Sequence, residues 1–407
     1  MSIERVVIIG GGQAARRTCE ELRELGFAGD ITLVGEEAEL PYDRPMLSKD
    51  VLKDFGSLSK VFVKGRDWYV ANRIDLRLGV RAEKIDRAGQ CVYLDNREIL
   101  PYDRLLIATG SRPRPFPGNI SADNLVHYVR TIEDVRRLNS AMLSAKNIAI
   151  LGGGFIGLEI AASLTALGIR VRVLDPAQQL LQRSVPLMIS ETLKSAHESR
   201  GVMFNLGETS TSIELHESGQ VLLSGATSDY LADLVIVGIG VHPNTELAEE
   251  AGLKVNNGIV VDQYCRTDDP LIYAAGEVTN HYNSFSDCRL RVESWKVAED
   301  QPAIAARNML GASEAYEDIP WLWSDQYDIN LQTLGRFDPG MILVKKELDK
   351  VGSYCVFGLD QSHRLAAVAG INAGREVSIA RKIMQRRIPL DLQDLGDAAM
   401  PLRKLLI

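Results

Sequence analysis

The stretch "RVVIIGGGQAARRTCEELRELG", residues 5–26, contains an apolar run, a glycine loop, a helical stretch and a closing glycine that suits a helix C-terminus. The stretch "NIAILGGGFIGLEIAASLTALG", residues 147–168, repeats that order. Each copy leads into a second β-branched run, "DITLVGEE" after the first and "RVRVLDP" after the second, and each of these runs ends in an acidic residue. The sequence therefore predicts two βαβ units.

The glycine loops follow the pattern G-x-G-x-x-G/A. In this pattern the first glycine makes the tight turn, the second lets the backbone approach a pyrophosphate, and the third lets the helix pack on the strand. These positions hold Gly10, Gly12 and Ala15 in the first copy and Gly152, Gly154 and Gly157 in the second. One such loop alone is also compatible with a tight turn that binds nothing. Two copies, followed by Glu36 and Asp175 in positions suited to a ribose, favour two dinucleotide sites.

Two dinucleotide sites suggest a flavin and a nicotinamide nucleotide. The runs at residues 102–115 and 269–278 resemble the segments that close the FAD site in flavoproteins with two dinucleotide domains, and the second βαβ unit lies between them. We expect an α/β fold with two Rossmann-like, glutathione-reductase-like domains and a smaller α+β C-terminal domain. The expected boundaries are 1–112 and 243–318 for the FAD-binding domain, 113–242 for the NAD-binding domain and 319–407 for the C-terminal domain.

Charge and composition narrow the class of protein. The net charge of −8 disfavours nucleic-acid binding, because phosphate recognition needs a positive face. No apolar run approaches the length of a membrane span and no signal-peptide pattern precedes the first strand, so we expect a cytoplasmic protein. The five cysteines show no CxxC spacing; we expect them to be small buried hydrophobes and expect no metal site and no dithiol relay.

Asp175 also indicates which nicotinamide nucleotide is preferred. A carboxylate at the end of this strand accepts hydrogen bonds from a ribose 2′-hydroxyl but repels a 2′-phosphate. The following stretch, "DPAQQLLQ", contains no Lys or Arg, and Arg183 is the first cation after it. NADH is therefore favoured over NADPH.

Taken together, the motifs "GGGQAA", "PYDRPMLSKD", "LLIATGSRPRP", "YVRTIED", "GGGFIGLEIAASL", "GIGVHPN", "AAGEV", "VESWKVAEDQ" and "WLWSDQYDINLQTLG" occur in this order along the chain. In this respect the sequence resembles the FAD-dependent NADH:ferredoxin reductases of Rieske dioxygenase and cytochrome P450 systems, the family of putidaredoxin reductase and biphenyl dioxygenase ferredoxin reductase. The resemblance runs nearly end to end.

The resemblance implies two sets of cofactor-binding residues. For FAD they are Gly10, Gly12, Ala14, Ala15, Glu36, Arg44, Lys49, Ala82, Thr109, Gly110, Arg130, Glu277 and Trp295. For NAD they are Gly152, Gly154, Ile156, Gly157, Glu159, Asp175, Arg183 and Gly240. Glu277 stands where the family normally has Asp, and this extra methylene is expected to weaken FAD binding.

The resemblance also implies the candidate catalytic residues Lys49, Glu159 and Trp323. It places Lys49 beside Glu159, near the flavin and bridging the two nucleotide domains. A lysine there favours the electron-rich reduced flavin, and its partner acid lies just after the second glycine loop. Trp323 and Trp321 are expected to be interface or core aromatics, with Trp323 also shaping the path by which electrons leave.

The expected partner is a 2Fe–2S ferredoxin, of Rieske type or adrenodoxin-like, that feeds an oxygenase, expected to be an aromatic-ring dioxygenase. A basic group on the helical stretch near residue 380, formed by Arg381, Lys382, Arg386 and Arg387, is the candidate docking surface, and a solvated helix face is the alternative. Other functions stay open: an NADH oxidase or rubredoxin-reductase-like electron transferase without a thiol, and a redox-sensing binding protein like apoptosis-inducing factor. Thiol and peroxide reductases of this fold are disfavoured, because "PYDRPMLSKD" contains no cysteine.

Overall fold

The computed structural model describes residues 3–225 and 227–406. The chain forms two compact units. Unit 1 consists of Met1–Asp43, Ser59–Arg112 and Val241–Pro320, and unit 2 of Arg44–Leu58, Pro113–Gly240 and Trp321–Ile407. Segment 44–58 thus clusters with unit 2, although it lies within the range 1–112 expected for the FAD-binding domain.

Unit 1 is built on a parallel sheet with the strand order β20-β7-β1-β2-β3. Its strands are β1 (Arg5–Ile9), β2 (Asp30–Gly35), β3 (Ile74–Leu78), β7 (Arg104–Ile107) and β20 (Ile272–Ala274). The central strand β1 is buried on both faces, which explains why its sequence is a continuous apolar run rather than an alternating one.

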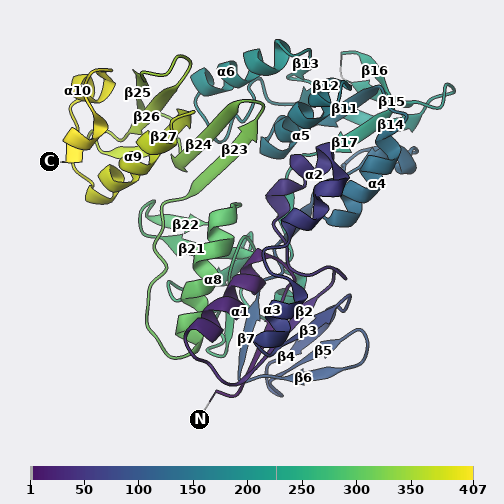
Figure 1. The fold of residues 1–407 in the computed structure, drawn as a ribbon, viewed down its shortest axis with the longest axis vertical. Helices are drawn as coiled ribbons and strands as arrows, with labels where there is room; N and C mark the ends of the chain where they lie inside the picture. The colour runs from purple at the N-terminus through teal and green to yellow at the C-terminus, as the bar shows by residue number, and fades with distance from the viewer. Residues whose placement is uncertain (1–2, 226, 407) are drawn as a thin grey trace. The chain divides into compact units, whose positions relative to one another are not determined.

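The two faces of β1 contribute to different cores. Val6 and Ile8 pack in the cluster that includes helices α1 (Gln13–Glu24) and α8 (Trp295–Met309), which lie side by side (Figure 1). Val7 and Ile9 pack on the other side, against the antiparallel sheet of β4 (Ala82–Asp86), β5 (Cys91–Leu94) and β6 (Ile99–Pro101). The alternation follows from the two-residue period of a strand. Unit 1 also contains α3 (Arg66–Ala71), α7 (Glu246–Glu250), β18 (Val241–Pro243), β19 (Ile259–Val261), β21 (Thr279–Asn283) and β22 (Cys288–Leu290).

Unit 2 repeats this plan with the order β10-β17-β11-β12-β13. The strands are β10 (Val126–His127), β11 (Asn147–Leu151), β12 (Arg170–Asp175), β13 (Met203–Leu206) and β17 (Leu234–Val237). The helices are α4 (Ile132–Met142), α5 (Phe155–Ala166) and α6 (Leu187–Glu198). A second sheet contains β9 (Asn119–Ile120), β14 (Ser210–Leu215), β15 (Val221–Gly225) and β16 (Asp229–Ala232), and segment 44–58 contributes η1 (Arg44–Met46) and α2 (Asp50–Lys53).

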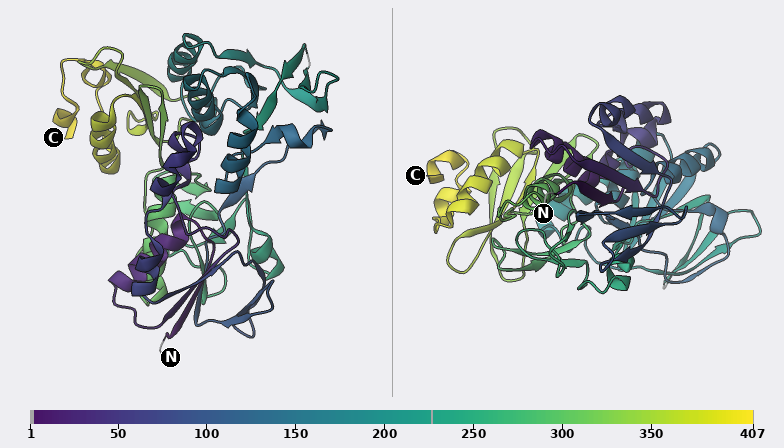
Figure 2. Two further views of the ribbon diagram at one scale, coloured as in Figure 1. Left: turned by 45° about the vertical axis from the view of Figure 1, so that its right-hand side comes forward. Right: turned by 90° about the horizontal axis from the view of Figure 1, so that it is seen from below.

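The C-terminal part of unit 2 is an antiparallel sheet ordered β23-β24-β27-β26-β25. Its strands are β23 (Trp321–Gln326), β24 (Ile329–Gly335), β25 (Ile342–Glu347), β26 (Tyr354–Leu359) and β27 (Leu365–Ile371). Helix α9 (Gly374–Arg386) lies along this sheet, followed by α10 (Leu392–Gly396) (Figure 2). The helical stretch expected near residue 380 is α9, and this part of the chain is α+β as expected.

One apolar core joins this sheet to the nucleotide-binding part of unit 2. Leu158 of α5 and Leu193 of α6 pack in the same cluster as Leu331 of β24 and Val356 of β26. Helix α5 is apolar on nearly every face, as expected of a helix whose residues 157–164 are all buried, and it contacts both α2 and β23. These contacts enclose Glu159, the one acid of α5.

Each parallel sheet begins with the same carboxylate clamp. Asp103, just before β7, accepts hydrogen bonds from the backbone N–H groups of Glu4 (2.9 Å) and Arg5 (2.8 Å) at the start of β1. Asp233, just before β17, does the same for Lys146 (2.7 Å) and Asn147 (2.8 Å) at the start of β11. The two units that repeat in sequence therefore also share these hydrogen bonds at the start of their central strands, β1 and β11.

Candidate functional site

The glycine loop of unit 1 leaves room for a phosphate group where the pattern requires it. Gly10 has φ of +132°, and a Cβ there would lie 2.2 Å from the carbonyl oxygen of Ala108, so the turn excludes any side chain. At Gly12, the N-cap of α1, nothing lies within 4 Å of a Cβ position. No side chain caps this helix end and its first turn contains no acid. Its N–H groups and partial positive charge thus suit a pyrophosphate.

The glycine loop of unit 2 has the same geometry. A Cβ at Gly152 would lie 2.3 Å from the Gly238 oxygen, whereas nothing lies within 4 Å of a Cβ at Gly154, the uncapped N-cap of α5. At Gly157 a Cβ would lie 2.1 Å from the Gly152 oxygen, so helix and strand pack too closely for alanine. Ala15, at the corresponding position of unit 1, is fully buried. The third position thus demands glycine only in unit 2.

A buried glutamine that the sequence did not single out supports the FAD segment around Glu277. Gln301 of α8 accepts hydrogen bonds from the N–H of Gly276 (2.8 Å) and the hydroxyl of Thr279 (3.0 Å). Gly276 has φ of +87°, and a Cβ there would lie 3.2 Å from Cβ of Ala14 in the first turn of α1. The loop that carries Glu277 is therefore fixed against the glycine-loop helix.

Other predicted FAD residues of unit 1 have defined partners. The Thr109 hydroxyl donates to the Asn244 carbonyl (2.7 Å), and the Asn244 amide donates back to the Thr109 carbonyl (2.8 Å). The Trp295 indole N–H donates to Asp43 (3.0 Å). Glu36 is exposed and lies one residue beyond the end of β2. The unit also contains Gly110 and Ala82, the first residue of β4.

The remaining predicted FAD residues, Arg44, Lys49 and Arg130, belong to unit 2. There the Arg44 guanidinium donates to the Arg130 carbonyl at 2.8 Å. The structure thus divides the predicted FAD set between the two units, while all predicted NAD residues lie in unit 2.

Asp175 organises the second glycine loop. It is the last residue of β12, and its Oδ2 accepts the N–H of Gly153 at 2.6 Å while its Oδ1 accepts the N–H of Ala177 at 2.7 Å. By strand register Leu174 corresponds to Val34, so Asp175 corresponds to Gly35 and the two predicted ribose acids differ by one position. Each carboxylate oxygen keeps a further lone pair, so Asp175 fits both its loop contacts and a ribose hydroxyl.

The other predicted NAD residues border this loop. Ile156, in the first turn of α5, is 45% exposed. Such exposure is unusual for a large apolar side chain in a helix that is otherwise mostly buried. Arg183 is exposed and follows the loop after β12, and Gly240, with φ of +105°, follows β17. An exposed apolar side chain at a helix N-terminus suits contact with a flat ring such as nicotinamide.

Lys49 and Glu159 form the expected ion pair, with Lys49 Nζ 2.9 Å from Glu159 Oε1. Only 4% of the Glu159 side chain and 18% of the Lys49 side chain are exposed. Glu159 also accepts hydrogen bonds from the hydroxyls of Ser48 (2.5 Å) and Ser324 (2.7 Å). Both residues belong to unit 2, so the pair joins segment 44–58 to α5 within one unit.

Trp323 lies on β23 and stacks on Trp321, with ring centroids 5.0 Å apart and an interplanar angle of 23°. Both rings are half-buried. This exposure suits the expected interface role better than a core role.

Three of the five cysteines are unsuited to thiol chemistry because they are buried. Cys19, Cys265 and Cys355 are buried, and burial raises the pKa of the Cys19 and Cys355 thiols to about 12 and that of Cys265 further still. The prediction of burial is wrong for Cys91 and Cys288, which are half-buried because they lie in short strands of small three-stranded sheets. All five are free.

The basic group of the predicted docking surface lies on and just after α9. Lys382, Arg386 and Arg387 are exposed and Arg381 is half-buried, while Val377, Ala380, Ile383 and Met384 form the buried face of the helix. The cations thus occupy the side of α9 that faces away from the sheet.

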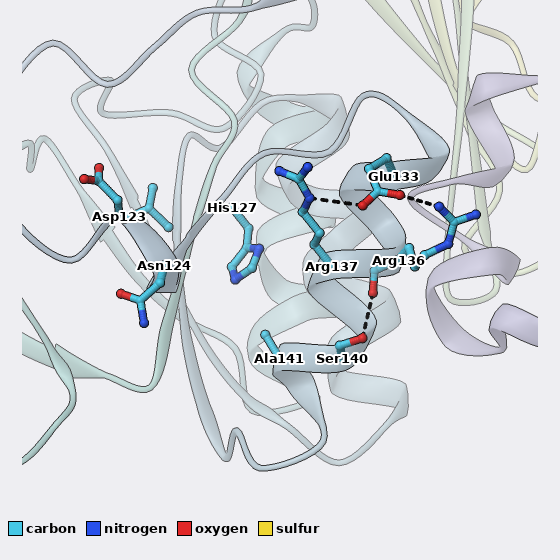
Figure 3. A pocket seen from close by; sticks show the side chains of 9 residues that line it. Asp123, Asn124, His127, Glu133, Arg136, Arg137, Ser140 and Ala141 are labelled. Atoms are coloured by element: carbon cyan, nitrogen blue, oxygen red, sulfur yellow. Dashed lines mark hydrogen bonds and ion pairs between the residues drawn. The ribbon is translucent and has the colours of Figure 1, made fainter. Parts of the chain in front are cut away.

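A surface hollow of about 660 Å³ lies in unit 2 beside α4 (Figure 3). It is lined by Asp123, Asn124, Val126, His127, Glu133, Arg136, Arg137, Ser140 and Ala141. Burial lowers the pKa of His127, and Glu133 pairs with Arg136 and Arg137. None of these residues belongs to either glycine loop or to the predicted cofactor-binding residues.

Within residues 3–225 and 227–406, no group of three or more His, Cys, Asp or Glu side chains is arranged to hold a metal ion. No helix there is long and apolar enough to cross a membrane.

Two Rossmann-like units in one chain, each with an open glycine loop, define a flavin- and nicotinamide-dependent oxidoreductase. The chain matches the family model described as pyridine nucleotide-disulphide oxidoreductase over residues 4–302, and the model described as reductase C-terminal over residues 321–406. The chain belongs to the pyridine nucleotide-disulphide oxidoreductase family. This membership confirms the expected fold class and the expected cofactors, FAD and NADH.

The relatives are more specific. Over the full length of both chains, the protein is 47% identical to the ferredoxin–NAD(+) reductase component of an anthranilate 1,2-dioxygenase system from Burkholderia cepacia. It is 39% identical to the corresponding component of a p-cumate 2,3-dioxygenase system from Pseudomonas putida, with 98% of each chain covered. The crystal structure of a covalent putidaredoxin reductase–putidaredoxin complex superposes on it with a TM-score of 0.94 at 33% identity, covering 99% of this chain and 98% of that one. The resemblance to ferredoxin reductases is therefore confirmed.

Proposed function

We propose that this protein is the NADH:ferredoxin reductase component of an aromatic-ring dioxygenase system. The observation that carries the proposal is the pair of glycine loops, each with open space at its second glycine, within a chain that matches ferredoxin–NAD(+) reductases of such systems from end to end. The acceptor is a 2Fe–2S ferredoxin, and the ferredoxin delivers the electrons to the oxygenase. A cytoplasmic location stays a prediction.

In this proposal the glycine loop of unit 1 receives FAD and the glycine loop of unit 2 receives NADH. The N-terminus of α1 and the loop around Gly276 receive FAD, and the N-terminus of α5 and Asp175 receive NADH. FAD held at the glycine loop of unit 1 would supply the redox chemistry that links a hydride donor, NADH, to a one-electron acceptor. The work of the protein is positioning, and no side-chain nucleophile takes part.

Lys49, Glu159 and Trp323 are assigned to this positioning. Glu159 fixes the Lys49 ammonium group by an ion pair, and Ser48 and Ser324 hold Glu159 in place. Ile156 offers an apolar surface to the nicotinamide ring. Trp323, stacked on Trp321, contributes to the surface from which electrons leave. Each of these roles is a proposal.

Electron delivery to different acceptors tests this function. The FAD-loaded protein is supplied with NADH, and reduction of a 2Fe–2S ferredoxin is followed by its absorbance, with glutathione disulfide and hydrogen peroxide as the competing acceptors. We expect ferredoxin to be reduced at least tenfold faster than either alternative, since the cysteines are free and three of them are buried. Faster reduction of the disulfide or the peroxide would contradict the proposal.

A redox-sensing binding protein like apoptosis-inducing factor is the less favoured alternative. Nucleic-acid binding by such a protein needs an extended positive surface, and the net charge here is −8. The oxidase alternative predicts that oxygen consumption with NADH proceeds as fast without ferredoxin as ferredoxin reduction does with it.

A further inference from the structure

Glu159 is the end of a chain of polar side chains that runs through the interior of unit 2. Its Oε1 accepts the hydroxyl of Ser324 at 2.7 Å, and Ser324 Oγ accepts from Gln326 Nε2 at 3.0 Å. Gln326 Oε1 lies 2.9 Å from His197 Nε2, and His197 Nδ1 lies 2.9 Å from the hydroxyl of Tyr327. Ser324 and His197 are 0% exposed and Gln326 is 1% exposed.

The chemistry of these groups gives the chain one direction. Because the Gln326 amide donates to Ser324 through its nitrogen, its oxygen faces His197 and must accept, so Nε2 of His197 carries the proton. Burial lowers the pKa of His197, so the ring is neutral and its Nδ1 accepts from the Tyr327 hydroxyl. Every donor in this series of hydrogen bonds then points toward Glu159. Its carboxylate is the one group of the series that accepts without donating.

The far end of the chain is anchored. Tyr327 is the first residue of the tight turn between β23 and β24 and has φ of +56°, a left-handed conformation that is unfavourable for a large side chain. Arg200 lies over its ring at 4.3 Å and pairs with Asp328 at 2.7 Å. These contacts fix the turn on the C-terminal end of α6 in spite of its backbone strain.

The charged and titratable groups along this series of hydrogen bonds are Lys49 and Glu159 at one end and His197, Tyr327, Arg200 and Asp328 at the other. The Gln326 amide between them neither takes up nor releases a proton near neutral pH. The chain is therefore unsuited to conduct protons. What it fixes is the orientation of each donor and, at its end, of the Glu159 carboxylate.

We propose that His197, Gln326 and Ser324 are positioning residues for Glu159: a one-way hydrogen-bond relay that connects α6 and the C-terminal hairpin to the Lys49–Glu159 pair. The relay holds the carboxylate where it pairs with Lys49, and through that pair it sets the rate of reduction by NADH. This inference rests on the role that Glu159 has in the proposed function.

The direction of the relay is tested by nitrogen NMR. The FAD-loaded protein is prepared with ¹⁵N-labelled histidine, and the signals of His197 among the six histidines are identified by their loss in His197→Gln. We expect a neutral ring with the proton on Nε2 from about pH 6 to about pH 8. A proton on Nδ1, or a charged ring in this range, overturns the relay. This result does not depend on whether the protein reduces ferredoxin.

The connection to Glu159 is tested by a double-mutant cycle. The limiting rate of flavin reduction and the dissociation constant of NADH are measured for Ser324→Ala in the wild-type and Glu159→Gln backgrounds. We expect Ser324→Ala to lower the limiting rate about tenfold, the effect of one hydrogen bond to a charged group, and Ser324→Thr to retain it. In the Glu159→Gln background we expect Ser324→Ala to have no further effect.

Ser190→Ala is the matched control, because it removes a buried hydroxyl from α6 outside the relay, and we expect wild-type rates for it. Equal losses from Ser324→Ala in both backgrounds show a structural role only and overturn the inference. Wild-type protein that reduces no ferredoxin contradicts the proposed function instead, and the NMR result still decides the direction of the relay.

Discussion

At the scale of single residues, Glu159 is a charged group placed where a charge is costly. It lies in the first turns of an apolar helix, and its carboxylate is stabilised by Lys49 and two serine hydroxyls. Buried ion pairs add little net stability, because desolvation offsets their attraction. We propose that this pair, which lies next to the glycine loop, serves the function of the protein by positioning Lys49.

Replacing Lys49 tests this assignment. Lys49→Ala removes the cation but leaves Glu159 with the hydroxyls of Ser48 and Ser324, so we expect the fold to persist. The rate of flavin reduction by NADH is expected to fall about tenfold or more, measured by stopped-flow absorbance. Lys53→Ala, which removes a nearby lysine that pairs with Asp50 at the surface, is the control. If both variants reduce at the wild-type rate, Lys49 has no role in catalysis.

Asp175 gives a prediction about cofactor choice. Its carboxylate repels a 2′-phosphate and also holds the glycine loop through Gly153, so the Asp175→Asn variant is expected to lose efficiency with both nucleotides. The loss of the hydrogen bond to the glycine loop affects both nucleotides, so it cancels in the ratio of kcat/KM for NADH to kcat/KM for NADPH. The loss of repulsion does not cancel, and we expect this ratio to fall about tenfold. An unchanged ratio would show that another residue selects the nucleotide.

The sequence predicted the glycine positions and the Lys49–Glu159 pair, but not the side chains around that pair. Ser324 lies 165 positions from Glu159, and Gln326 lies 129 positions from His197. No local pattern marks a contact of this kind, because a serine or glutamine in a strand looks the same whether it faces solvent or a buried carboxylate. Segment 44–58 joined unit 2 for a similar reason: its contacts with α5 are not visible in its own sequence.

At the scale of elements, the duplicated carboxylate clamp explains how each parallel sheet begins. Asp103 and Asp233 each receive two successive N–H groups that would otherwise lack a partner at the first residues of β1 and β11. The signal was present in the sequence, where "YDRLLI" and "ADLVIV" each place an aspartate just before an apolar strand. The role of each aspartate becomes clear only from the neighbouring strand, whose N–H groups it accepts.

Asp103 gives a prediction for the pH dependence of stability. The Arg5 side chain, together with the backbone N–H groups of Glu4 and Arg5, lowers the pKa of Asp103 to about 2. Because the pKa is lowered in the folded state, the stabilisation is complete above the ordinary value near 4 and is lost as the pH falls toward 2. We expect Asp103→Asn to lower the free energy of unfolding at pH 7 by about 1–2 kcal/mol. The melting temperature is expected to fall accordingly.

The difference in melting temperature between wild type and Asp103→Asn is expected to shrink as the pH is lowered from about 5 to about 3. Asp95→Asn, an exposed aspartate in the same unit, is the control and is expected to change nothing. A difference that stays constant with pH would mean that the Asp103 charge does not contribute.

At the scale of the whole molecule, an acidic protein must offer its partner a local surface. The cations of α9 form a local positive group on a protein whose net charge is −8. Such a group can guide a partner, because electron-transfer complexes have small interfaces and their association is steered by charge. The sequence located this basic group. The structure adds that Lys382 and Arg386 are exposed on the side of α9 opposite its buried face.

Reversing these two charges tests the docking surface. The variant Lys382→Glu with Arg386→Glu is expected to raise the KM for ferredoxin about tenfold at low salt, and the increase is expected to shrink at high salt, because salt screens the attraction. Reduction by NADH is expected to be unchanged. Lys254→Glu with Arg97→Glu, two exposed cations of unit 1, alters the net charge equally. Equal effects of the two double variants would leave α9 without a specific role.

The most direct test of the account is a double-mixing experiment under anaerobic conditions. The FAD-loaded protein is first mixed with one equivalent of NADH and then with a 2Fe–2S ferredoxin, while flavin and iron–sulfur absorbance are followed together. We predict that NADH bleaches the flavin and that two ferredoxins are reduced for each flavin reoxidised. A flavin that NADH does not bleach, or a reduced flavin that ferredoxin leaves unoxidised, would contradict the account.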